Sequence, residues 1–338
     1  MPKQRFSTYI IISASVITLL AAAYFINSRK PTESVNYTRS AMGTVVELTL
    51  MKGDQTRYDE AAEAAFAEIE RLEALLSSYR PESDLSRINR SAGEAMVEVA
   101  PEVIAAVKAG LKVSLLSSGA FDPTVGVLAG VWGPSGEKGI VPSQDDLQRL
   151  LPLVDYRGVV VDEAAGKAGL AKRGMALNLG GVAKGYIAGR AAEVLKAHGV
   201  RRGIVHAGGD MFVFQEGREE PFTIGIQHPR KKGALLAEAY VYNGAVPTSG
   251  DYERYFEKDS VRYHHILDPK TGFPAQGTQS VTLVAQDPAM ADALSTAVFV
   301  MGPVKGMELV ERLEGVEGVI VDGDGNVKVS SGFEGKIY

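Results

Sequence analysis

The sequence predicts an α+β protein, in which helices and strands are mixed along the chain, preceded by an N-terminal hydrophobic segment. Three observations favour this fold class. Apolar residues recur at helical spacing over residues 58–77, apolar and polar residues alternate over 44–50, and glycine-rich turns join several short apolar runs. The elements do not follow a regular strand–helix–strand rhythm, which argues against a doubly wound parallel sheet. A chain of 338 residues can form one large domain or two ordinary ones.

The first 30 residues differ from the rest. Lys3 and Arg5 precede an uncharged, mostly apolar run over residues 9–26, and Arg29 and Lys30 follow it. This pattern predicts a cleaved signal peptide or an uncleaved membrane anchor. We favour the anchor, because the run is long for a signal peptide, and we expect the following portion to lie outside the cytoplasm. Residues 31–36 are expected to be a linker and residues 37–338 the folded domain.

Composition excludes several classes of protein. The chain has no cysteine, so thiolate metal sites, cysteine nucleophiles and disulfides are ruled out. The formal net charge is −5, although the first 30 residues carry four basic side chains and no acidic one. The folded part is therefore distinctly acidic, which argues against nucleic-acid binding.

The first third of the chain combines one strand with two helices. Residues 37–51 are expected to form a strand with Met42 near its front, and residues 58–77 and 101–117 to form amphipathic helices. Tyr79 follows the first helix and could stack on a flat ring, although a packing role explains it equally simply.

A small-residue segment follows the second helix. Its sequence is SGAFDPTVG, in which Ala120 leaves room for a ligand, Phe121 offers a ring and Asp122 offers a hydrogen-bond acceptor. A short helix over residues 142–151 and a hairpin over 159–171 are expected next.

Two glycine-containing segments come next. In ALNLGGVAKGY, two glycines between an expected strand and helix form a possible anion-binding turn, with Lys184 close by. The spacing fits neither a P-loop nor a dinucleotide-binding turn. Residues 204–214 are expected to be a strand broken by Gly-Gly-Asp, in which Asp210 is either a ligand contact or a turn residue. Another strand is expected over 222–229.

The stretch from residue 248 to 275 is dense in groups that handle charge and protons. Thr248, Ser249 and Gly250 pair two hydroxyls with a glycine that lets backbone amides approach a ligand. Two histidines then precede an Ile-Leu run, which we expect to be a strand, and residues 268–272 predict a tight turn. On this stretch alone, a hairpin with a satisfied histidine is the simplest interpretation.

Near the C-terminus, Asp292 and Thr296 are four residues apart on an expected helix that Asp287 caps and Pro288 begins. They share one helical face and offer two hard oxygen ligands of the kind that Mg²⁺ prefers. An exposed aspartate and an ordinary helix threonine would explain the pair as well. The other elements expected here are a strand over 280–285, a helix over 303–315 and a hairpin over 316–329.

Seven motifs, in order, resemble the ApbE family of FAD:protein FMN transferases. They include SSYRPESDLSRIN, GAFDPT, LNLGGVAKGY, HHILDPKTGFPA and ADALSTAVFVMG, and the resemblance spans roughly residues 37–335. Asn178 departs from the usual aspartate but keeps a capping side chain, so we expect a small effect. Many members carry a lipid-attachment cysteine near the N-terminus, which this chain lacks.

The resemblance implies a fold of two intertwined lobes with the active site between them. It implies Mg²⁺-dependent transfer of the FMN moiety of FAD to a Ser or Thr hydroxyl of an acceptor flavoprotein, with release of AMP. Together with the N-terminal segment, it predicts an enzyme anchored in the inner membrane and facing the periplasm, or secreted to the periplasm. FAD hydrolysis to FMN and AMP, and FAD binding without catalysis, are the alternatives.

The resemblance also assigns residues. The Ala183 carbonyl, Asp292 and Thr296 are the metal ligands, His265 is the general base in preference to His264, and Asp268 orients it or binds the ligand. The residues expected to contact FAD are Met42, Tyr79, Ala120, Phe121, Asp122, Lys184, Asp210, Thr248, Ser249, Gly250 and His265.

Overall fold

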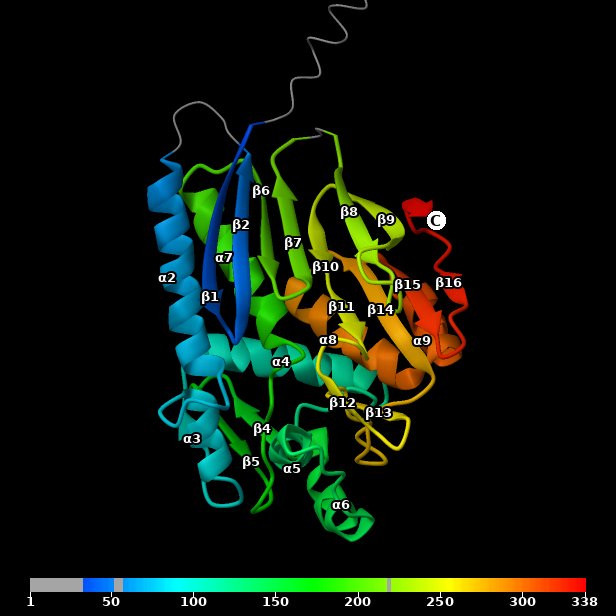
Figure 1. Cartoon of the computed structure of the whole chain (residues 1–338). Helices are drawn as coiled ribbons and strands as arrows, with labels where there is room; N and C mark the ends of the chain where they lie inside the picture. Colours follow the sequence, from blue (N-terminus) through cyan, green and yellow to red (C-terminus); the bar gives the residue numbers. More distant parts are fainter. Residues whose placement is uncertain (1–32, 52–56, 218–219) are drawn as a thin grey trace, which may run out of the picture.

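The computed structural model describes residues 33–51, 57–217 and 220–338 (Figure 1). The predicted N-terminal hydrophobic segment lies outside these residues. Within the described ranges, no helix is long and apolar enough to cross a membrane.

A nine-stranded sheet is the centre of the molecule, and every pair of neighbours in it is antiparallel. Its order is β1-β2-β6-β7-β10-β14-β15-β16, and β11 also pairs with β14. The strands are β1 (Ser34–Ala41), β2 (Thr44–Met51), β6 (Arg202–Ala207), β7 (Asp210–Gln215), β10 (Gly244–Val246), β11 (Thr248–Gly250), β14 (Thr278–Ala285), β15 (Val316–Asp322) and β16 (Val327–Val329).

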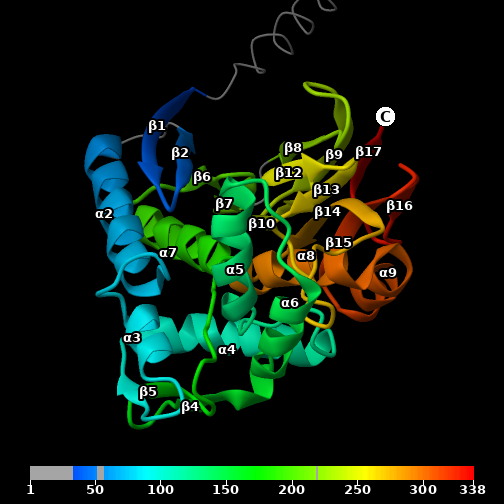
Figure 2. The same cartoon turned by 60° about the horizontal axis from the view of Figure 1, so that its bottom comes forward.

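Helices cover one face of this sheet (Figures 1 and 2). They are α2 (Tyr58–Leu76), α4 (Pro101–Leu116), α7 (Ala183–Ala197), α8 (Pro288–Met301) and α9 (Pro303–Arg312). Their apolar faces and the inward side chains of the strands form one large core; Phe66, Ile69 and Leu72 bury the stripe of α2 that the sequence predicts. The other face carries a three-stranded sheet of β8 (Phe222–Gln227), β9 (Leu235–Val241) and β17 (Gly335–Ile337), which shares a second apolar core with β7 and β15.

Smaller elements gather at one end of the sheet, at the bottom of Figure 1. They are α3 (Asp84–Arg90), β3 (Val97–Glu98), α5 (Gly126–Glu137), α6 (Gln144–Leu150), β4 (Val159–Asp162), β5 (Lys167–Leu170), β12 (Tyr255–Lys258) and β13 (Val261–His264), with 3-10 turns at Leu151–Leu153 and Tyr156–Gly158. The chain enters this end after α2, leaves it before α7 and returns for β12 and β13. The molecule is therefore a mixed α/β fold, as the sequence predicts.

Three expected strands differ from the structure. Residues 37–51 form not one strand but the β1–β2 hairpin, which begins at Ser34, so residues 34–36 of the expected 31–36 linker belong to β1. Residues 176–179 contribute one isolated bridge, between Ala176 and Val125, and no strand. The strand at the two histidines lies before Ile266–Leu267 and not over them: β13 runs from Val261 to His264, so it includes His264 and ends before His265.

Candidate active site

Two tight hairpin turns lie side by side at the end of the sheet near α4. Met42 and Gly43 turn β1 into β2 with φ of 54° and 68°, and Gly208 and Gly209 turn β6 into β7 with φ of 58° and 98°. Two residues at positive φ are typical of the type I′ turn, which matches the twist of paired strands. A Cβ at Gly208 would lie 2.5 Å from Oγ1 of Thr44, so only glycine lets the two tips approach. This approach brings Met42 and Asp210 to the same edge.

A buried charge cluster occupies that edge. The ammonium of Lys184, on the first turn of α7, donates to Oδ2 of Asp210 and lies 4.0 Å from Oδ1 of Asp292. Oδ1 of Asp210 also accepts a hydrogen bond from the backbone of Thr248, at 3.2 Å. Burial alone would lower the pKa of Lys184, but the two carboxylates outweigh it and raise the pKa. Lys184 therefore stays charged, and it joins α7, β7 and α8.

Asp292 is held where α8 crosses the start of α7. Only 3 % of its surface is exposed, and its Oδ2 accepts a hydrogen bond from the backbone of Gly185 at 3.0 Å. Burial raises the pKa of Asp292 above its usual range, and the nearby Asp210 adds to the effect, while Lys184 opposes it. A carboxylate this costly to charge gains stability from a bound cation.

Thr296 lies one turn further along the same face of α8. A Cβ at Gly181 would lie 3.1 Å from its Oγ1, and one at Gly185 would lie 2.8 Å from Cβ of Asp292. The Gly181–Gly185 segment, with Ala183 at its centre, therefore packs against both side chains. Asp292 and Thr296 thus both lie against the start of α7, where Ala183 begins the helix.

The donor chemistry of that set fits a hard cation. A carboxylate, a hydroxyl and a backbone carbonyl supply oxygen alone, which suits Mg²⁺. Among the described residues, no group of three or more His, Cys, Asp or Glu side chains gathers as a metal site. The convergence of mixed oxygen donors is thus what favours a metal here.

The hydroxyls of β11 face into the protein. Oγ of Ser249 lies 2.8 Å from Oγ of Ser295 and 3.4 Å from Oγ1 of Thr296, whereas Oγ1 of Thr248 lies 2.8 Å from Oγ1 of Thr282. The expected FAD contacts Thr248 and Ser249 are thus already engaged with α8 and β14. Gly250 lies against the ring of Tyr252, where a Cβ would approach to 2.5 Å.

The two adjacent histidines have different environments. His264 is buried; Nε2 lies 2.8 Å from the Ala275 carbonyl, and Nδ1 accepts from the Ile266 backbone at 3.3 Å. Both ring nitrogens are therefore occupied, and burial lowers the pKa of His264. His264 is a satisfied core histidine.

His265 is exposed, and its ring extends from the end of β13. Nδ1 lies 3.4 Å from the Arg254 carbonyl, which can only accept, so the Nδ1 proton points to that carbonyl and Nε2 keeps a lone pair. Loss of solvation beside the surrounding protein lowers the pKa of His265, and the charges of His264 and Arg254 add to this lowering. His265 is therefore neutral near pH 7, with a basic nitrogen available.

The turn after His265 is rigid and locally satisfied. Oδ1 of Asp268 accepts from the Lys270 backbone at 2.8 Å, and the Gly272 backbone donates to the Asp268 carbonyl at 2.9 Å, as the predicted tight turn requires. Within the part of the chain that the structure describes, no hydrogen bond joins Asp268 to His265. Trp132 on α5 anchors this turn, because its Nε1 donates to the Gly272 carbonyl at 2.7 Å.

The segment before α5 is internally bonded. Asp122 is buried; Oδ1 accepts from the backbone and the hydroxyl of Thr124, and Oδ2 from the Tyr156 backbone at 2.9 Å. Asp122 thus organises its own loop. Phe121 is buried beside Gly181, where a Cβ would lie 3.1 Å from its ring. Tyr79, by contrast, is 86 % exposed and free to stack on a ligand.

The turn before α7 keeps the geometry expected of Asn178. Its Oδ1 accepts a hydrogen bond from the Gly180 backbone at 2.8 Å, so the side chain caps the glycine turn despite the missing charge.

Comparison with known proteins identifies the family. The model of the ApbE family matches residues 42–320. The chain belongs to the ApbE family.

Relatives of known name agree with this membership. The FAD:protein FMN transferase of Treponema pallidum is 35 % identical over 295 residues, covering 82 % of this chain and 81 % of the relative. That of Klebsiella pneumoniae is 33 % identical, covering 88 % and 92 %. The crystal structure of the ApbE protein from Thermotoga maritima superimposes with a TM-score of 0.82 at 36 % identity, covering 88 % of this chain and 97 % of that one. The flavin transferase ApbE from Vibrio cholerae gives a TM-score of 0.79 at 26 % identity, covering 89 % and 98 %.

Some residues around this ApbE site carry no signal in the sequence. Glu73 on α2 accepts from the Met42 backbone at 2.9 Å, and Arg254 lies beside Gly43 and offers its carbonyl to His265. Each contact joins a backbone group to a side chain elsewhere in the sequence, and no spacing along the chain indicates such contacts. The preference for His265 over His264 came from the family motif, and burial gives it a physical reason.

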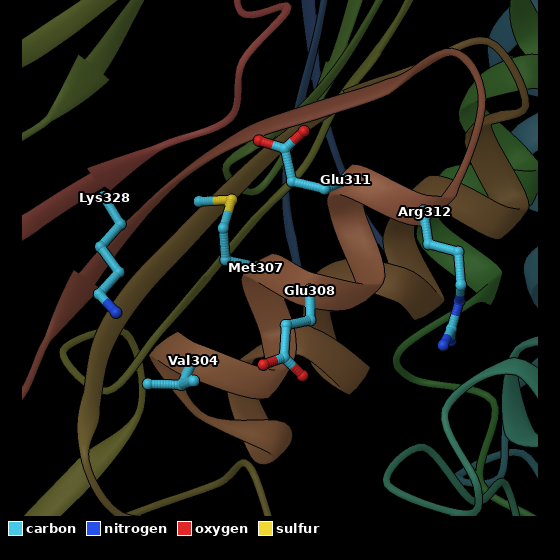
Figure 3. A pocket seen from close by; sticks show the side chains of 6 residues that line it. All are labelled: Val304, Met307, Glu308, Glu311, Arg312 and Lys328. Carbon is cyan, nitrogen blue, oxygen red and sulfur yellow. The ribbon is translucent and has the colours of Figure 1, made fainter.

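The ApbE site is separate from a hollow of about 530 Å³ between α9 and β16 (Figure 3). Its lining residues are Val304, Met307, Glu308, Glu311, Arg312 and Lys328. None of them belongs to the predicted site, and the hollow is open and shallow, so we assign the chemistry to the convergence of α7, α8 and the His265 turn.

Proposed function

We propose that the protein is an FAD:protein FMN transferase that moves the FMN moiety of FAD onto a Ser or Thr hydroxyl of an acceptor flavoprotein and releases AMP, with Mg²⁺ as cofactor. The observation that carries the proposal is the packing of Asp292 and Thr296 against the start of α7, with Lys184 among them. The names of the relatives support the reaction class.

The chain's own residues would hold the metal as follows. Asp292 through Oδ1, Thr296 through Oγ1 and Ala183 through its carbonyl would bind Mg²⁺ beside the diphosphate. The ion, when bound, neutralises charge on the diphosphate as the bridging bond breaks. Lys184 adds a fixed positive charge and keeps Asp210 in place.

His265 would act as the general base. With its Nδ1 proton directed to the Arg254 carbonyl, Nε2 accepts the proton of the acceptor hydroxyl. The hydroxyl oxygen then bonds to the FMN-side phosphorus, and the bond from that phosphorus to the bridging oxygen breaks, so AMP leaves with that oxygen. Asp268 would hold the turn after His265 or bind the ligand.

Several of the other expected contacts would line the FAD site between the two intertwined lobes. Tyr79 would stack on a ring of FAD from the rim, since its side chain is largely exposed. Met42, at the tip of the β1–β2 hairpin, would line the same side of the FAD site. Phe121 and Ala120 would form part of the floor.

Incubation with FAD and Mg²⁺ tests the function, with and without secreted flavoproteins of the same organism as acceptors. AMP formed only with an acceptor, and flavin that remains on the denatured acceptor, would support transfer. AMP formed without an acceptor would indicate hydrolysis, and no AMP would indicate a binding protein.

We also propose that the enzyme works in the periplasm, either anchored in the inner membrane through residues 1–30 or released after cleavage. Basic residues on both sides of an uncharged apolar run support this location. A reporter enzyme fused after Lys30 should be active only across the membrane; activity in the cytoplasm would contradict the proposal.

A further inference from the structure

The hydroxyls of Ser295, Ser249 and Thr296 form a hydrogen-bonded chain, here called the hydroxyl chain, that joins β11 to α8. Ser295 lies on α8 and is 1 % exposed, and its Oγ lies 2.8 Å from the carbonyl of Asp292. Ser249 on β11 follows at 2.8 Å from Oγ of Ser295, and Thr296 at 3.4 Å from Oγ of Ser249. Each hydroxyl has one proton and accepts through two lone pairs.

The Asp292 carbonyl sets the direction of the hydrogen bonds along this hydroxyl chain. A carbonyl can only accept, so the single proton of Ser295 goes to the Asp292 carbonyl. Ser295 must then accept a hydrogen bond from Ser249, so the single proton of Ser249 is directed to Ser295. Ser249 can in turn only accept from Thr296. All three protons are thus used within the hydroxyl chain.

The consequence is an orientation of Thr296. Its hydroxyl proton is directed to Ser249, so both of its lone pairs remain available to a partner, and Gly181 lies close to the same Oγ1. A hydroxyl that presents lone pairs accepts a cation, whereas one that presents its proton would donate to a phosphate oxygen. The hydroxyl chain therefore decides which partner Thr296 can bind.

We infer that Ser249 and Ser295 are positioning residues that hold Thr296 as a cation ligand. The inference rests on the proposed function, since it deepens the metal site proposed there. It also gives Ser249 a role behind the metal ligand, in place of the direct contact with FAD that the sequence predicts. Ser295 is not among the predicted site residues, yet its hydrogen bond to the Asp292 carbonyl sets the direction of the hydrogen bonds along the hydroxyl chain.

The inference ranks two substitutions in an order that distance would not suggest. Ser249→Ala removes the acceptor of Thr296, whose proton is then free to turn to another side. Ser295→Ala removes the acceptor of Ser249, so the proton of Ser249 turns to Thr296 and the proton of Thr296 turns toward the cation. Substitutions of residues that orient metal ligands typically weaken metal binding by about 10- to 100-fold. We expect Ser295→Ala to weaken it at least as much as Ser249→Ala, although Ser295 touches no ligand.

The test is a titration of the full folded chain with Mn²⁺, in which paramagnetic resonance measures the free ion and Mg²⁺ competes, with and without FAD. Ser114→Ala is the matched control, because Ser114 is a buried helix serine whose Oγ bonds a carbonyl one turn back, at 3.0 Å. Circular dichroism verifies the fold of each variant.

The expected result is a Kd for Mn²⁺ about 10-fold or more higher in Ser295→Ala and in Ser249→Ala than in Ser114→Ala. If the parent binds Mn²⁺ and Ser295→Ala binds it as tightly as Ser114→Ala does, the hydroxyl chain does not orient Thr296 and the inference is wrong. If the parent binds neither ion, the metal site of the proposed function fails, and the inference fails with it.

Discussion

Replacement of Gly185 by alanine tests the crossing of α7 and α8 on which the candidate site depends. A Cβ at this position would lie 2.0 Å from the Pro288 carbonyl oxygen and 2.8 Å from Cβ of Asp292, whereas ordinary contacts begin at 3.4 Å. The carbonyl belongs to the backbone of α8 and cannot rotate away. The two helices must therefore move apart by about 1.4 Å at this point, as the difference between 3.4 and 2.0 Å requires.

The expected cost follows from two opposing effects. Overpacking of this kind destabilises a protein by about 1–3 kcal/mol, and sometimes more. Alanine gains about 0.5–1 kcal/mol over glycine inside a helix. The separation also stretches the 3.0 Å hydrogen bond from Gly185 to Oδ2 of Asp292. We therefore expect a lower free energy of unfolding and, because Asp292 and Ala183 separate, Mn²⁺ binding weakened by at least about 10-fold.

The assays are urea unfolding and the Mn²⁺ titration, with Gly130→Ala as control. Gly130 lies in α5, and a Cβ there would meet no atom within 4 Å. That variant should gain about 0.4–1 kcal/mol of stability and leave metal binding unchanged. A Gly185→Ala protein as stable as Gly130→Ala, with normal Mn²⁺ binding, would refute the reasoning.

Three further predictions concern the titratable groups of the site. His265→Ala should slow transfer by about 10²- to 10⁴-fold with FAD affinity little changed. His264→Ala should leave turnover nearly intact but lower the free energy of unfolding by about 2–5 kcal/mol, since it opens a cavity and leaves the Ala275 carbonyl without its partner; the opposite ranking of turnover would move the base to His264. The value of kcat/KM should fall in acid with a midpoint below the ordinary histidine pKa of about 6.5, because the pKa of His265 is lowered and its ring stays neutral to lower pH. A midpoint above that value would exclude His265 as the base. Asp292→Asn should abolish Mn²⁺ binding and raise the free energy of unfolding of the metal-free protein at pH 8. This gain in stability should shrink as the pH falls toward about 4, because the raised pKa of Asp292 lets the parent protein bind a proton over that range. A stability gain that grows in acid would contradict the prediction.

Much of the fold could be predicted from local pattern. The α2 helix follows a clear apolar stripe, α8 begins at its Asp287 cap and Pro288, and the β4–β5 hairpin follows its turn residues. These features depend on neighbours in the sequence, which a reader of the sequence can see. The helices α3 and α5 and the strand β17 were not predicted; α5, with four glycines and a proline, has a composition that does not favour a helix.

The features of the site that the sequence does not predict have a common cause. The sequence predicts Met42 and Gly43 near the front of a strand, whereas the structure places them in a turn, because Met42 adopts a positive φ that a sequence rarely indicates for a residue other than glycine. Its backbone is held by Glu73, 31 residues away. The roles of Asp122 and Ser249 likewise depend on partners in other elements. Local pattern identifies which residues carry chemistry, but tertiary contacts decide whether each faces a ligand or the protein.

The single tryptophan gives the protein one optical probe in one place. Trp132 is buried, stacks on Tyr263 at a centroid distance of 5.8 Å and bonds the Gly272 carbonyl, so its emission reports the contact between α5 and the turn after His265. Far-ultraviolet dichroism reports mainly the helices behind the large sheet. Coincident denaturation curves would mean that the turn after His265 unfolds together with the core, whereas an earlier change in fluorescence would show that this end of the sheet opens on its own. Bound flavin absorbs where indole emits, so the same residue would also signal the arrival of FAD by quenching.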